Sequence, residues 1–228
     1  MNSLPTLILL HGALGSETQF TPLKSLLTND FSVYTLDFAG HGGRALPDHF
    51  SIEHFSSELH RFIENHELTN VNIFGYSMGG YVALHLASIR PEHIARIMTL
   101  GTMLKWNPEI AEREVRQLNP ETIETKVPKW AEQLRQRHAP QDWKIILRKT
   151  AEMMTELGTG TAMPLDEFKK IKIPVLITLG TMDQIVSREE CLEVVNLLSQ
   201  GQFHAFEGFK HPIEMADFTI LAKKIKSF

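Results

Sequence analysis

The sequence has little cysteine, no long apolar run and no excess of positive charge. Cys191 is the only cysteine among 228 residues, so an internal disulfide cannot form and a reducing compartment is compatible with the chain. No apolar run approaches the ~20 residues that a membrane-spanning helix needs. The 23 basic and 27 acidic residues are well mixed and give a net charge of −4, which argues against a nucleic-acid-binding face. We therefore expect neither a nucleic-acid partner nor a membrane span, and we expect Cys191 to be a small buried residue.

Targeting signals and cofactor-binding motifs are also missing. The first five residues, Met1 to Pro5, contain no basic residue, so we expect no signal peptide and predict a cytoplasmic location. No histidine–carboxylate or paired-cysteine spacing of a metal site occurs, and no glycine loop matches a nucleotide-binding fingerprint. We therefore expect neither a metal nor a cofactor. The length of 228 residues favours one domain, or one domain with an insertion, and we expect a monomer or a homodimer.

Six apolar runs of strand length alternate with segments of helical periodicity. Runs that are apolar on both sides and separated by helices predict a parallel sheet covered by helices on both faces. The expected strands are residues 6–11, 31–37, 71–76, 94–100, 173–179 and 203–206. The expected helices outside the long gap between the fourth and fifth strands are residues 23–27, 52–66, 78–89, 188–199 and 213–225.

The long gap between the fourth and fifth strands has its own character. Residues 107–157 are helical in pattern, rich in charge and broken by prolines, and no strand candidate interrupts them. Such a segment between two strands predicts a helical insertion rather than a part of the doubly wound core. We therefore divide the chain into a first core part (1–106), a helical insertion (107–160) and a second core part (161–228).

One five-residue motif, Gly75-Tyr76-Ser77-Met78-Gly79, lies between a predicted strand and a predicted helix. A G-x-S-x-G sequence in this context is typical of a nucleophile elbow, in which a tight turn exposes the serine hydroxyl. Glycine two residues before and two residues after the serine removes side chains that would clash in the turn. Ser77 would then lie at the carboxyl edge of the sheet, at the positive end of the following helix. Without its context, the motif would equally fit an ordinary strand–helix turn capped by a serine.

Asp183 and His211 are the partners that Ser77 would need. A serine hydroxyl is a weak nucleophile that requires a base, and the base requires an acid that holds it in the right tautomer. Asp183 follows the fifth predicted strand and His211 follows the sixth, so both fall on the sheet edge that carries Ser77. The order serine, acid, histidine is the one that accompanies this elbow. The sequence therefore predicts a catalytic triad of Ser77, Asp183 and His211.

The other histidines and Asp37 fit structural roles better than catalytic ones. His11 belongs to the first loop, and His41 is flanked by glycines after the second strand. Asp37 also ends a strand, but it precedes Ser77 in the chain, so we expect it to fix a loop. The histidines that lie in amphipathic or surface patterns are His60, His66, His93, His138 and His204.

Acyl transfer also requires an oxyanion hole built from N–H donors. One donor is expected from the residue after the nucleophile, which is Met78. The other is expected from the loop after the first strand, where glycines allow the backbone to approach the site closely. We assign this second donor to the backbone N–H of Ala13.

The chain resembles the α/β-hydrolase superfamily over nearly its whole length. The resemblance rests on five segments in the expected order, LLHGALGS, LDFAGHGG, GYSMGGYVAL, LGTMDQIV and KHPIEMAD. It implies an α/β-hydrolase fold in which the first strand lies beside the strand that precedes Ser77. Because the first predicted strand begins at Thr6, we expect a doubly wound, six-stranded, all-parallel sheet that lacks the two N-terminal strands of the family. The resemblance also implies that the helical insertion is a lid over the active site.

Within this superfamily, serine at position 77 argues against haloalkane dehalogenases and epoxide hydrolases, which would carry aspartate there. The motif also resembles that of the menaquinone-pathway lyase, which has a tyrosine before the serine, as Tyr76 is here. That lyase carries an arginine in the following helix for the carboxylates of its substrate, where this chain has Tyr81. The arginines of the insertion that could replace it are Arg113, Arg116 and Arg148.

We expect an apolar substrate pocket between the sheet edge and the insertion. Its expected substrate-binding residues are Leu14, Met103 and Trp106, with Met78, Met153 and Met154 as further candidates. The expected reaction is a carboxylesterase-like hydrolysis of a small, mainly apolar ester or thioester through an acyl-enzyme on Ser77. Two alternatives stay open: a carbon–carbon bond hydrolase or menaquinone-pathway-type lyase that uses the same triad, and a non-catalytic ligand-binding protein of the same fold.

Overall fold

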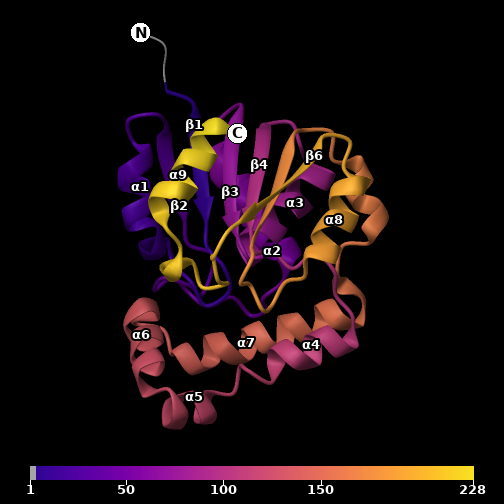
Figure 1. The fold of residues 1–228 in the computed structure, drawn as a ribbon. Coiled ribbons are helices and arrows are strands. Elements are labelled where there is room, and N and C mark those ends of the chain that lie inside the picture. The colour runs from indigo at the N-terminus through magenta and orange to yellow at the C-terminus, as the bar shows by residue number, and fades with distance from the viewer. Residues whose placement is uncertain (1–3) are drawn as a thin grey trace.

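A six-stranded parallel sheet forms the centre of the computed structural model, which describes residues 4–228 (Figure 1). The strand order is β2-β1-β3-β4-β5-β6, so β1 lies beside β3 as the resemblance implies. All six predicted strands are present, with ends that shift by at most two residues. The strands are β1 (Thr6–Leu10), β2 (Ser32–Leu36), β3 (Val71–Tyr76), β4 (Ile94–Leu100), β5 (Val175–Gly180) and β6 (Gly201–Phe206).

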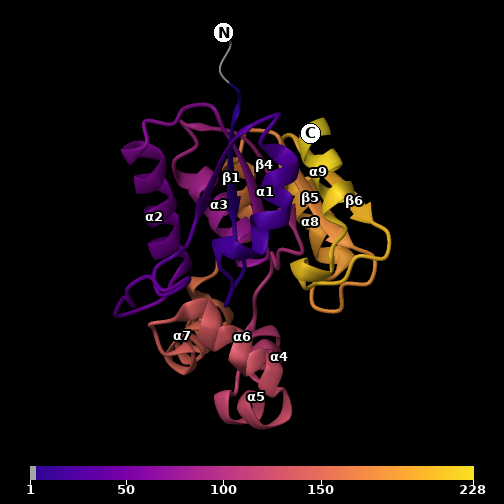
Figure 2. The same cartoon turned by 90° about the vertical axis from the view of Figure 1, so that its left-hand side faces the viewer.

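Helices cover both faces of the sheet (Figure 2). Leu7 and Leu9 of β1 share one buried cluster with α1 (Thr21–Leu27) and α9 (Phe218–Ser227). Ile8 and Leu10 belong to the cluster on the opposite face, because successive side chains of a strand alternate. Burial on both faces explains why the strands read as continuous apolar runs. The helices of this second face are α2 (Ile52–Asn65), α3 (Met78–Ile89) and α8 (Arg188–Leu197).

The segment between β4 and β5 is helical, as predicted, and lies beyond one end of the sheet (Figure 1). Pro108, Pro120 and Pro128 each begin a helix instead of breaking one, because proline lacks an N–H that the first helical position does not need. Asn107 and Asn119 then cap two of these helices by accepting hydrogen bonds from Ile110 N and Thr122 N. The helices are α4 (Pro108–Val115), α5 (Pro120–Lys126), α6 (Pro128–His138) and α7 (Trp143–Glu156), followed by a π-helical turn (Leu157–Thr161).

The prediction of one continuous helix over residues 213–225 is wrong. The structure has a short 3-10 turn (Ile213–Met215) and then α9, which begins only at Phe218. Asp217 separates them, because its carboxylate accepts hydrogen bonds from Thr219 N and Ile220 N and so caps the second helix. Further 3-10 turns are Glu17–Phe20 and Leu165–Lys170.

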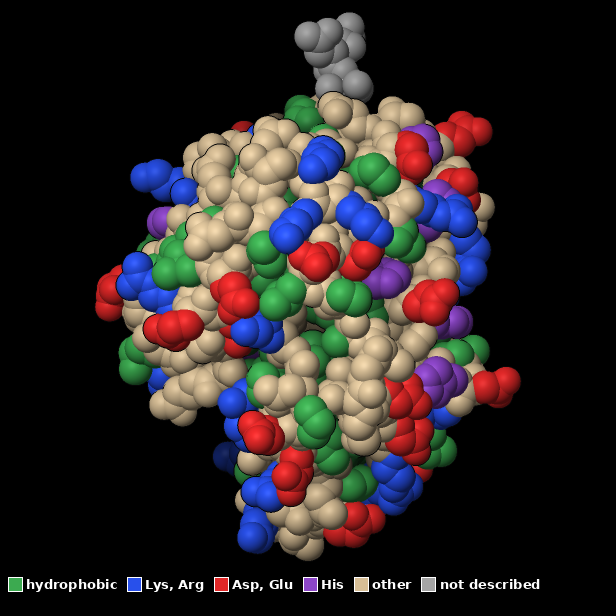
Figure 3. Space-filling model, turned by 90° about the vertical axis from the view of Figure 1, so that its right-hand side faces the viewer, with side chains coloured by type: hydrophobic (Ala, Val, Ile, Leu, Met, Phe, Trp, Pro, Cys, Tyr) green, Lys and Arg blue, Asp and Glu red, His purple; other side chains and the backbone are tan. Residues whose placement is uncertain are grey.

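The remaining general expectations concern the surface, the termini and the single cysteine. Within residues 4–228, no helix combines the length and the apolar character that crossing a membrane requires. Basic and acidic side chains are interspersed on the face that Figure 3 shows. Cys191 is fully buried, and burial raises the pKa of its thiol to about 12. The expectation that no signal peptide is present falls partly on residues 1–3, which lie outside the described residues.

Candidate active site

The turn that carries Ser77 lies between β3 and α3, at the carboxyl edge of the sheet. Ser77 has φ 48° and ψ −118°, a left-handed conformation that residues with a side chain rarely adopt. The turn is also tightly packed: a Cβ on Gly75 would lie 2.4 Å from Gly80 Cα, and a Cβ on Gly79 would lie 2.4 Å from Leu10 O. Only glycine fits at these two positions, so the motif specifies the turn as well as the serine.

Asp183 and His211 come together on the same edge, although they follow different strands. Asp183 follows β5 and His211 follows β6. His211 Nδ1 lies 2.8 Å from Asp183 Oδ2, so the ring donates its Nδ1 proton to the carboxylate and leaves Nε2 free to accept. The other carboxylate oxygen accepts hydrogen bonds from Ile185 N (2.8 Å) and Val186 N (3.1 Å).

These contacts decide the charge of Asp183. Burial raises the pKa of this carboxyl group, but hydrogen bonds from His211 and from two backbone N–H groups outweigh that effect. The pKa of Asp183 therefore lies below its usual value, and the side chain stays ionised beside His211.

Gly101 and Tyr76 connect the Asp183–His211 pair to the turn of Ser77. Gly101 directly follows β4. A Cβ on Gly101 would lie 3.1 Å from Asp183 Oδ2 and 3.2 Å from His211 Nδ1, so its backbone packs closely against the pair. The ring centres of Tyr76 and His211 lie 5.6 Å apart. Among residues 4–228 no hydrogen bond joins the Ser77 hydroxyl to His211. Such bonds are often long or poorly aligned without substrate.

The first loop approaches Ser77 from β1. A Cβ on Gly12 would lie 3.1 Å from Ser77 Cβ. The Gly12 carbonyl accepts hydrogen bonds from His11 Nδ1 (2.8 Å) and Gly15 N (3.0 Å). Because a trans peptide is planar, this hold on the carbonyl also restrains the direction of the Ala13 N–H in the same peptide unit. Within the described part of the chain, this N–H donates to no acceptor.

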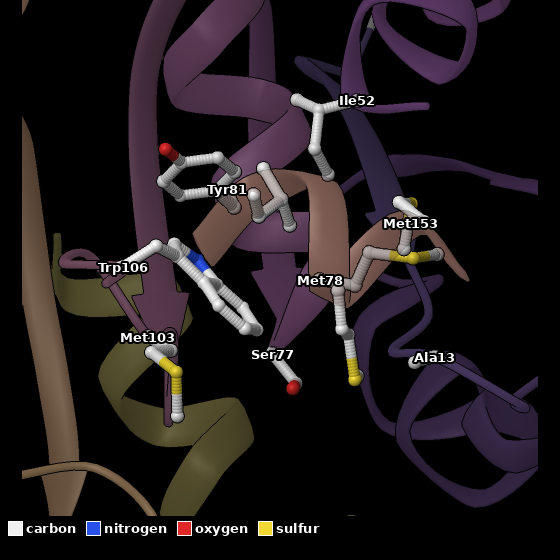
Figure 4. Close-up of a pocket in the computed structure, with 10 residues that line it drawn as sticks. Ala13, Ile52, Ser77, Met78, Tyr81, Met103, Trp106 and Met153 are labelled. Carbon is white, nitrogen blue, oxygen red and sulfur yellow. The ribbon is translucent and has the colours of Figure 1, made fainter. Parts of the chain in front are cut away.

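The second N–H of interest belongs to Met78. It is the first residue of α3, so its N–H has no acceptor within the helix and lies at the positive end of the helix dipole. Ala13, Ser77 and Met78 all face one cavity (Figure 4). Within residues 4–228, two N–H groups without an acceptor therefore belong to residues that line the same cavity as Ser77.

Comparison with known proteins identifies the family of the chain. The family model of the serine aminopeptidase S33 group of hydrolases matches residues 2–216. The chain belongs to this family. It is a hydrolase of the α/β-hydrolase superfamily, as the five sequence segments imply.

Individual relatives of the hydrolase are more distant. It is 27% identical over 207 residues to a candidate 2-succinyl-6-hydroxy-2,4-cyclohexadiene-1-carboxylate synthase of Bacillus subtilis (strain 168), covering 80% of this chain and 75% of that one. It is 33% identical over 109 residues to a candidate carbamate hydrolase, RutD, of Pseudomonas syringae pv. syringae (strain B728a), covering 47% of this chain. That match spans only 42% of RutD. The crystal structure of the enol-lactonase from Burkholderia xenovorans LB400 superposes with a TM-score of 0.81 at 17% identity, covering 99% of this chain and 91% of that one, and shows a shared fold.

The hydrolase has a mainly apolar cavity of about 360 Å³ beside Ser77, which includes space open to solvent. Met103 and Trp106 line it as expected, and the Trp106 indole points toward Ser77 in Figure 4. None of the described residues that line it carries a charged side chain. The lining residues are Ala13, Ile52, Ser77, Met78, Tyr81, Met103, Trp106, Met153, Met154 and Leu157.

Leu14 does not line the cavity, in contrast to its expected place there. Its side chain is buried in the main apolar cluster, and its backbone has φ 59°. Three lining residues were not anticipated. They are Ile52, which begins α2, Leu157, which follows α7, and Tyr81, whose hydroxyl oxygen accepts a hydrogen bond from Met163 N (2.8 Å). The helical spacing of apolar residues does not distinguish a side chain in the core from one in a cavity wall. The sequence therefore held no separate signal for these lining residues.

Three histidines of the hydrolase form a buried cluster next to this site. The ring centres of His11 and His41 lie 5.1 Å apart, and those of His41 and His138 lie 5.6 Å apart. All three rings are fully buried, so of the amphipathic or surface patterns that the sequence offered for His138, the buried side of an amphipathic helix applies. Burial lowers the pKa of His11 to about 3 and that of His138 to about 4. Within residues 4–228, no group of three His, Cys, Asp or Glu side chains is placed to hold a metal ion.

Proposed function

We propose that this hydrolase cleaves small, mainly apolar carboxylic esters or thioesters through an acyl-enzyme on Ser77. The observation that supports this most is the 2.8 Å hydrogen bond between His211 and Asp183 on the sheet edge that presents Ser77. A neutral imidazole with a free Nε2, next to a serine at a helix N-terminus, meets the requirements of nucleophilic acyl transfer.

In the acylation step, Ser77 Oγ attacks the carbonyl carbon while His211 Nε2 takes the hydroxyl proton. The electron pair of the C=O bond moves to oxygen, where the N–H groups of Ala13 and Met78 stabilise the negative charge. When the tetrahedral intermediate collapses, the bond to the leaving group breaks and His211 returns the proton to the departing alcohol or thiol. Asp183 orients the imidazole and stabilises its cation.

In the deacylation step, a water molecule gives a proton to His211 Nε2 and attacks the acyl carbon. The same two N–H groups stabilise the second oxyanion. His211 then returns the proton to Ser77 Oγ as the acyl–oxygen bond breaks, so the free acid leaves and the serine is restored.

The cavity supports an uncharged acyl group as the substrate. A carboxylate in a cavity without a charged partner would lose its hydration without compensation, which is costly. The methionines at positions 78, 103, 153 and 154 adapt to different apolar shapes, which fits a range of acyl groups. We also propose that residues 107–160 act as the lid, since Met153, Met154 and Leu157 of this segment line the cavity, together with Trp106 directly before it.

Hydrolysis of short p-nitrophenyl esters by the purified protein tests the proposal. Ser77→Ala should lower kcat by about 10⁴-fold or more, because the remaining groups cannot supply a nucleophile. Ser88→Ala is the matched control, since Ser88 lies on the same helix and its hydroxyl binds only His85 O. Turnover by Ser77→Ala at the wild-type rate would reject the assignment.

A lyase or carbon–carbon hydrolase is a second candidate, because the Bacillus subtilis relative covers 80% of the chain. The cavity argues against a dicarboxylate substrate. Tyr81 occupies the place of the arginine of that family, and Arg113, Arg116 and Arg148 are absent from the lining. These three arginines instead pair with carboxylates of the insertion: Glu114, Glu112 and Glu121. Product analysis with the menaquinone precursor or a diketone separates this candidate from an esterase.

A non-catalytic ligand-binding protein is the third candidate. A fluorophosphonate probe distinguishes it, because the probe reacts only with an activated serine. Labelling of the wild type that is lost in Ser77→Ala would reject this candidate. Location in the cytoplasm and assembly as a monomer or homodimer stay predictions.

A further inference from the structure

The Leu14 carbonyl is held by two residues of the lid. Arg137 Nη1 donates to Leu14 O at 2.9 Å, and His138 Nε2 donates to the same oxygen at 3.1 Å. Both donors lie at the end of α6, more than 120 positions further along the chain. The contact therefore forms only when α6 packs against the first loop of the core.

The tautomer of His138 follows from its second contact. Gly42 N donates to His138 Nδ1 at 3.2 Å, so this nitrogen accepts and the proton lies on Nε2, facing Leu14 O. The ring is fully buried between the two loops. One lid side chain thus joins the loop after β1 to the loop after β2.

Arg137 extends the connection to the loop that carries His211. Its Nη2 lies 3.0 Å from Glu214 Oε1, and the same oxygen accepts a hydrogen bond from Gln19 Nε2 at 2.6 Å. Glu214 lies in the 3-10 turn that begins two residues after His211. The end of α6 therefore contacts both core segments that flank Ser77.

Leu14 requires such support. Its φ of 59° places a leucine in the left-handed region, which is unfavourable for a residue with a Cβ. Two hydrogen bonds to its carbonyl, one from a guanidinium, offset that cost when the lid is docked. Within the loop itself, only the hydrogen bond from Gly15 N to Gly12 O (3.0 Å) spans Leu14 among the described residues, so the two lid contacts add to that single support.

Ala13 lies between the two fixed points of this loop. The core holds the carbonyl before it, since Gly12 O accepts from His11 and Gly15. The lid holds the carbonyl of the next residue, Leu14. The Ala13 N–H, which is assigned to the oxyanion hole, is therefore restrained directly by the core at Gly12 and through the backbone by the lid at Leu14.

We propose that Arg137 and His138 are positioning residues that complete the oxyanion hole only when α6 is docked on the core. The inference rests on the proposed acyl-transfer function. Docking of the lid then both encloses the substrate and fixes the Ala13 donor, so acylation is confined to the closed enzyme. An open lid would leave Ser77 accessible but the hole incomplete.

Arg137→Met tests the proposal, because methionine keeps an apolar stem while removing all donors. We expect kcat for a p-nitrophenyl ester to fall about ten- to a hundredfold while KM changes by less than about twofold, since a misplaced donor affects mainly the transition state. Arg137→Lys, which restores one donor and the charge, should recover part of kcat. The matched control is Arg135→Met on the same helix, where Arg135 pairs with the exposed Glu132 and Glu124.

Inhibitor binding separates positioning from a general disturbance. A trifluoromethyl ketone forms a tetrahedral adduct with the serine, and this adduct carries an oxyanion. The amide of the same shape forms no such adduct and binds as a ground-state analogue. Arg137→Met should weaken the ketone by the same factor as kcat and leave the affinity of the amide unchanged. Equal losses for both inhibitors, or a change confined to KM, would overturn the proposal.

Two further measurements test the hold on the first loop and the proposed function separately. Hydrogen exchange of the peptide that contains residues 11–15 should rise in Arg137→Met and not in Arg135→Met; unchanged exchange contradicts the inferred hold on the loop. Fluorophosphonate labelling of the wild type tests the proposed function separately. A labelled wild type with unchanged Arg137→Met kinetics rejects the positioning role alone, whereas an unlabelled wild type rejects both.

Discussion

At the scale of single residues, the orientation of the site's side chains depends on the hydrogen bonds and packing of their neighbours. Asp183 uses one oxygen for His211 and the other for two backbone N–H groups, so its carboxylate cannot rotate away from the ring. Tyr76 lies beside the same ring, and burial raises the pKa of its hydroxyl well above the usual value, so it stays neutral there. The orientation of His211 is therefore set by Asp183 and by packing, and not by Ser77.

Asp183→Asn should lower kcat for p-nitrophenyl esters by about 10⁴-fold with little change in the fold. The amide keeps the shape of the carboxylate but favours the tautomer with the proton on Nε2, which cannot accept from Ser77. Circular dichroism and thermal melting check that the variant folds. Activity within tenfold of the wild type would contradict the role of Asp183.

Gly79→Ala should destabilise the protein by roughly 1–3 kcal/mol or more. The new Cβ would lie 2.4 Å from Leu10 O and 2.6 Å from His11 O, and backbone carbonyls of a central strand and its loop cannot move aside. Urea unfolding measures the effect, and Ser88→Ala on the same helix is the control. An unchanged midpoint would show that the turn is looser than its geometry indicates.

At the scale of elements, the insertion and the core meet at the wall of the cavity. Trp106 precedes α4 and Leu157 follows α7, so both segments that join the insertion to the core contribute to this wall. The two segments pack tightly against each other, because a Cβ on Gly158 would lie 2.9 Å from Asn107 O. Trp106 and Leu157 also line a second hollow, formed by residues 104–108, 157–160 and 162–165.

Leu157→Ala should shift the preferred p-nitrophenyl ester toward longer acyl chains. Removing this side chain connects the cavity with the second hollow, so additional methylene groups gain apolar contact, each worth about 0.8 kcal/mol. A series of esters of increasing acyl length measures kcat/KM, with Ile145→Ala on the exposed side of α7 as the control. An unchanged length profile would show that the two spaces stay separate.

At the scale of the whole molecule, the buried histidines link stability to pH. His11, His41 and His138 have pKa values lowered mainly by burial, so the folded protein keeps them neutral where the unfolded chain protonates them. A depressed pKa contributes stability that is complete above the unfolded value near 6.5 and is lost as pH falls toward the folded value. His138 alone, with a folded pKa of about 4, would account for a loss of roughly 3 kcal/mol by pH 4.

The free energy of unfolding should therefore decrease steadily from pH 7 to pH 4. Urea titrations at several pH values measure this slope. His138→Gln should reduce the slope, because it removes one of the three groups, whereas His66→Gln on the exposed end of α2 should not. A slope that is the same in the wild type and in His138→Gln would contradict the account.

How much could be predicted from the sequence depends on the range of the interaction. The strands, the glycine-flanked turn and the order of Ser77, Asp183 and His211 rest on local patterns, because apolar runs and tight turns depend on neighbouring residues. The exception among local features was the stretch after His211, where the cap at Asp217 broke a helical pattern.

Only the tertiary structure decided which residues that are distant in the sequence come into contact. The sequence by itself determined the sheet, the helical insertion and the three residues that would form the triad. It held no signal that His138 is buried against the first loop, that Leu14 turns its carbonyl to the lid, or that Ile52 and Tyr81 wall the cavity. These contacts join residues up to 124 positions apart, and their energies come from burial and hydrogen bonds that exist only after the chain has folded.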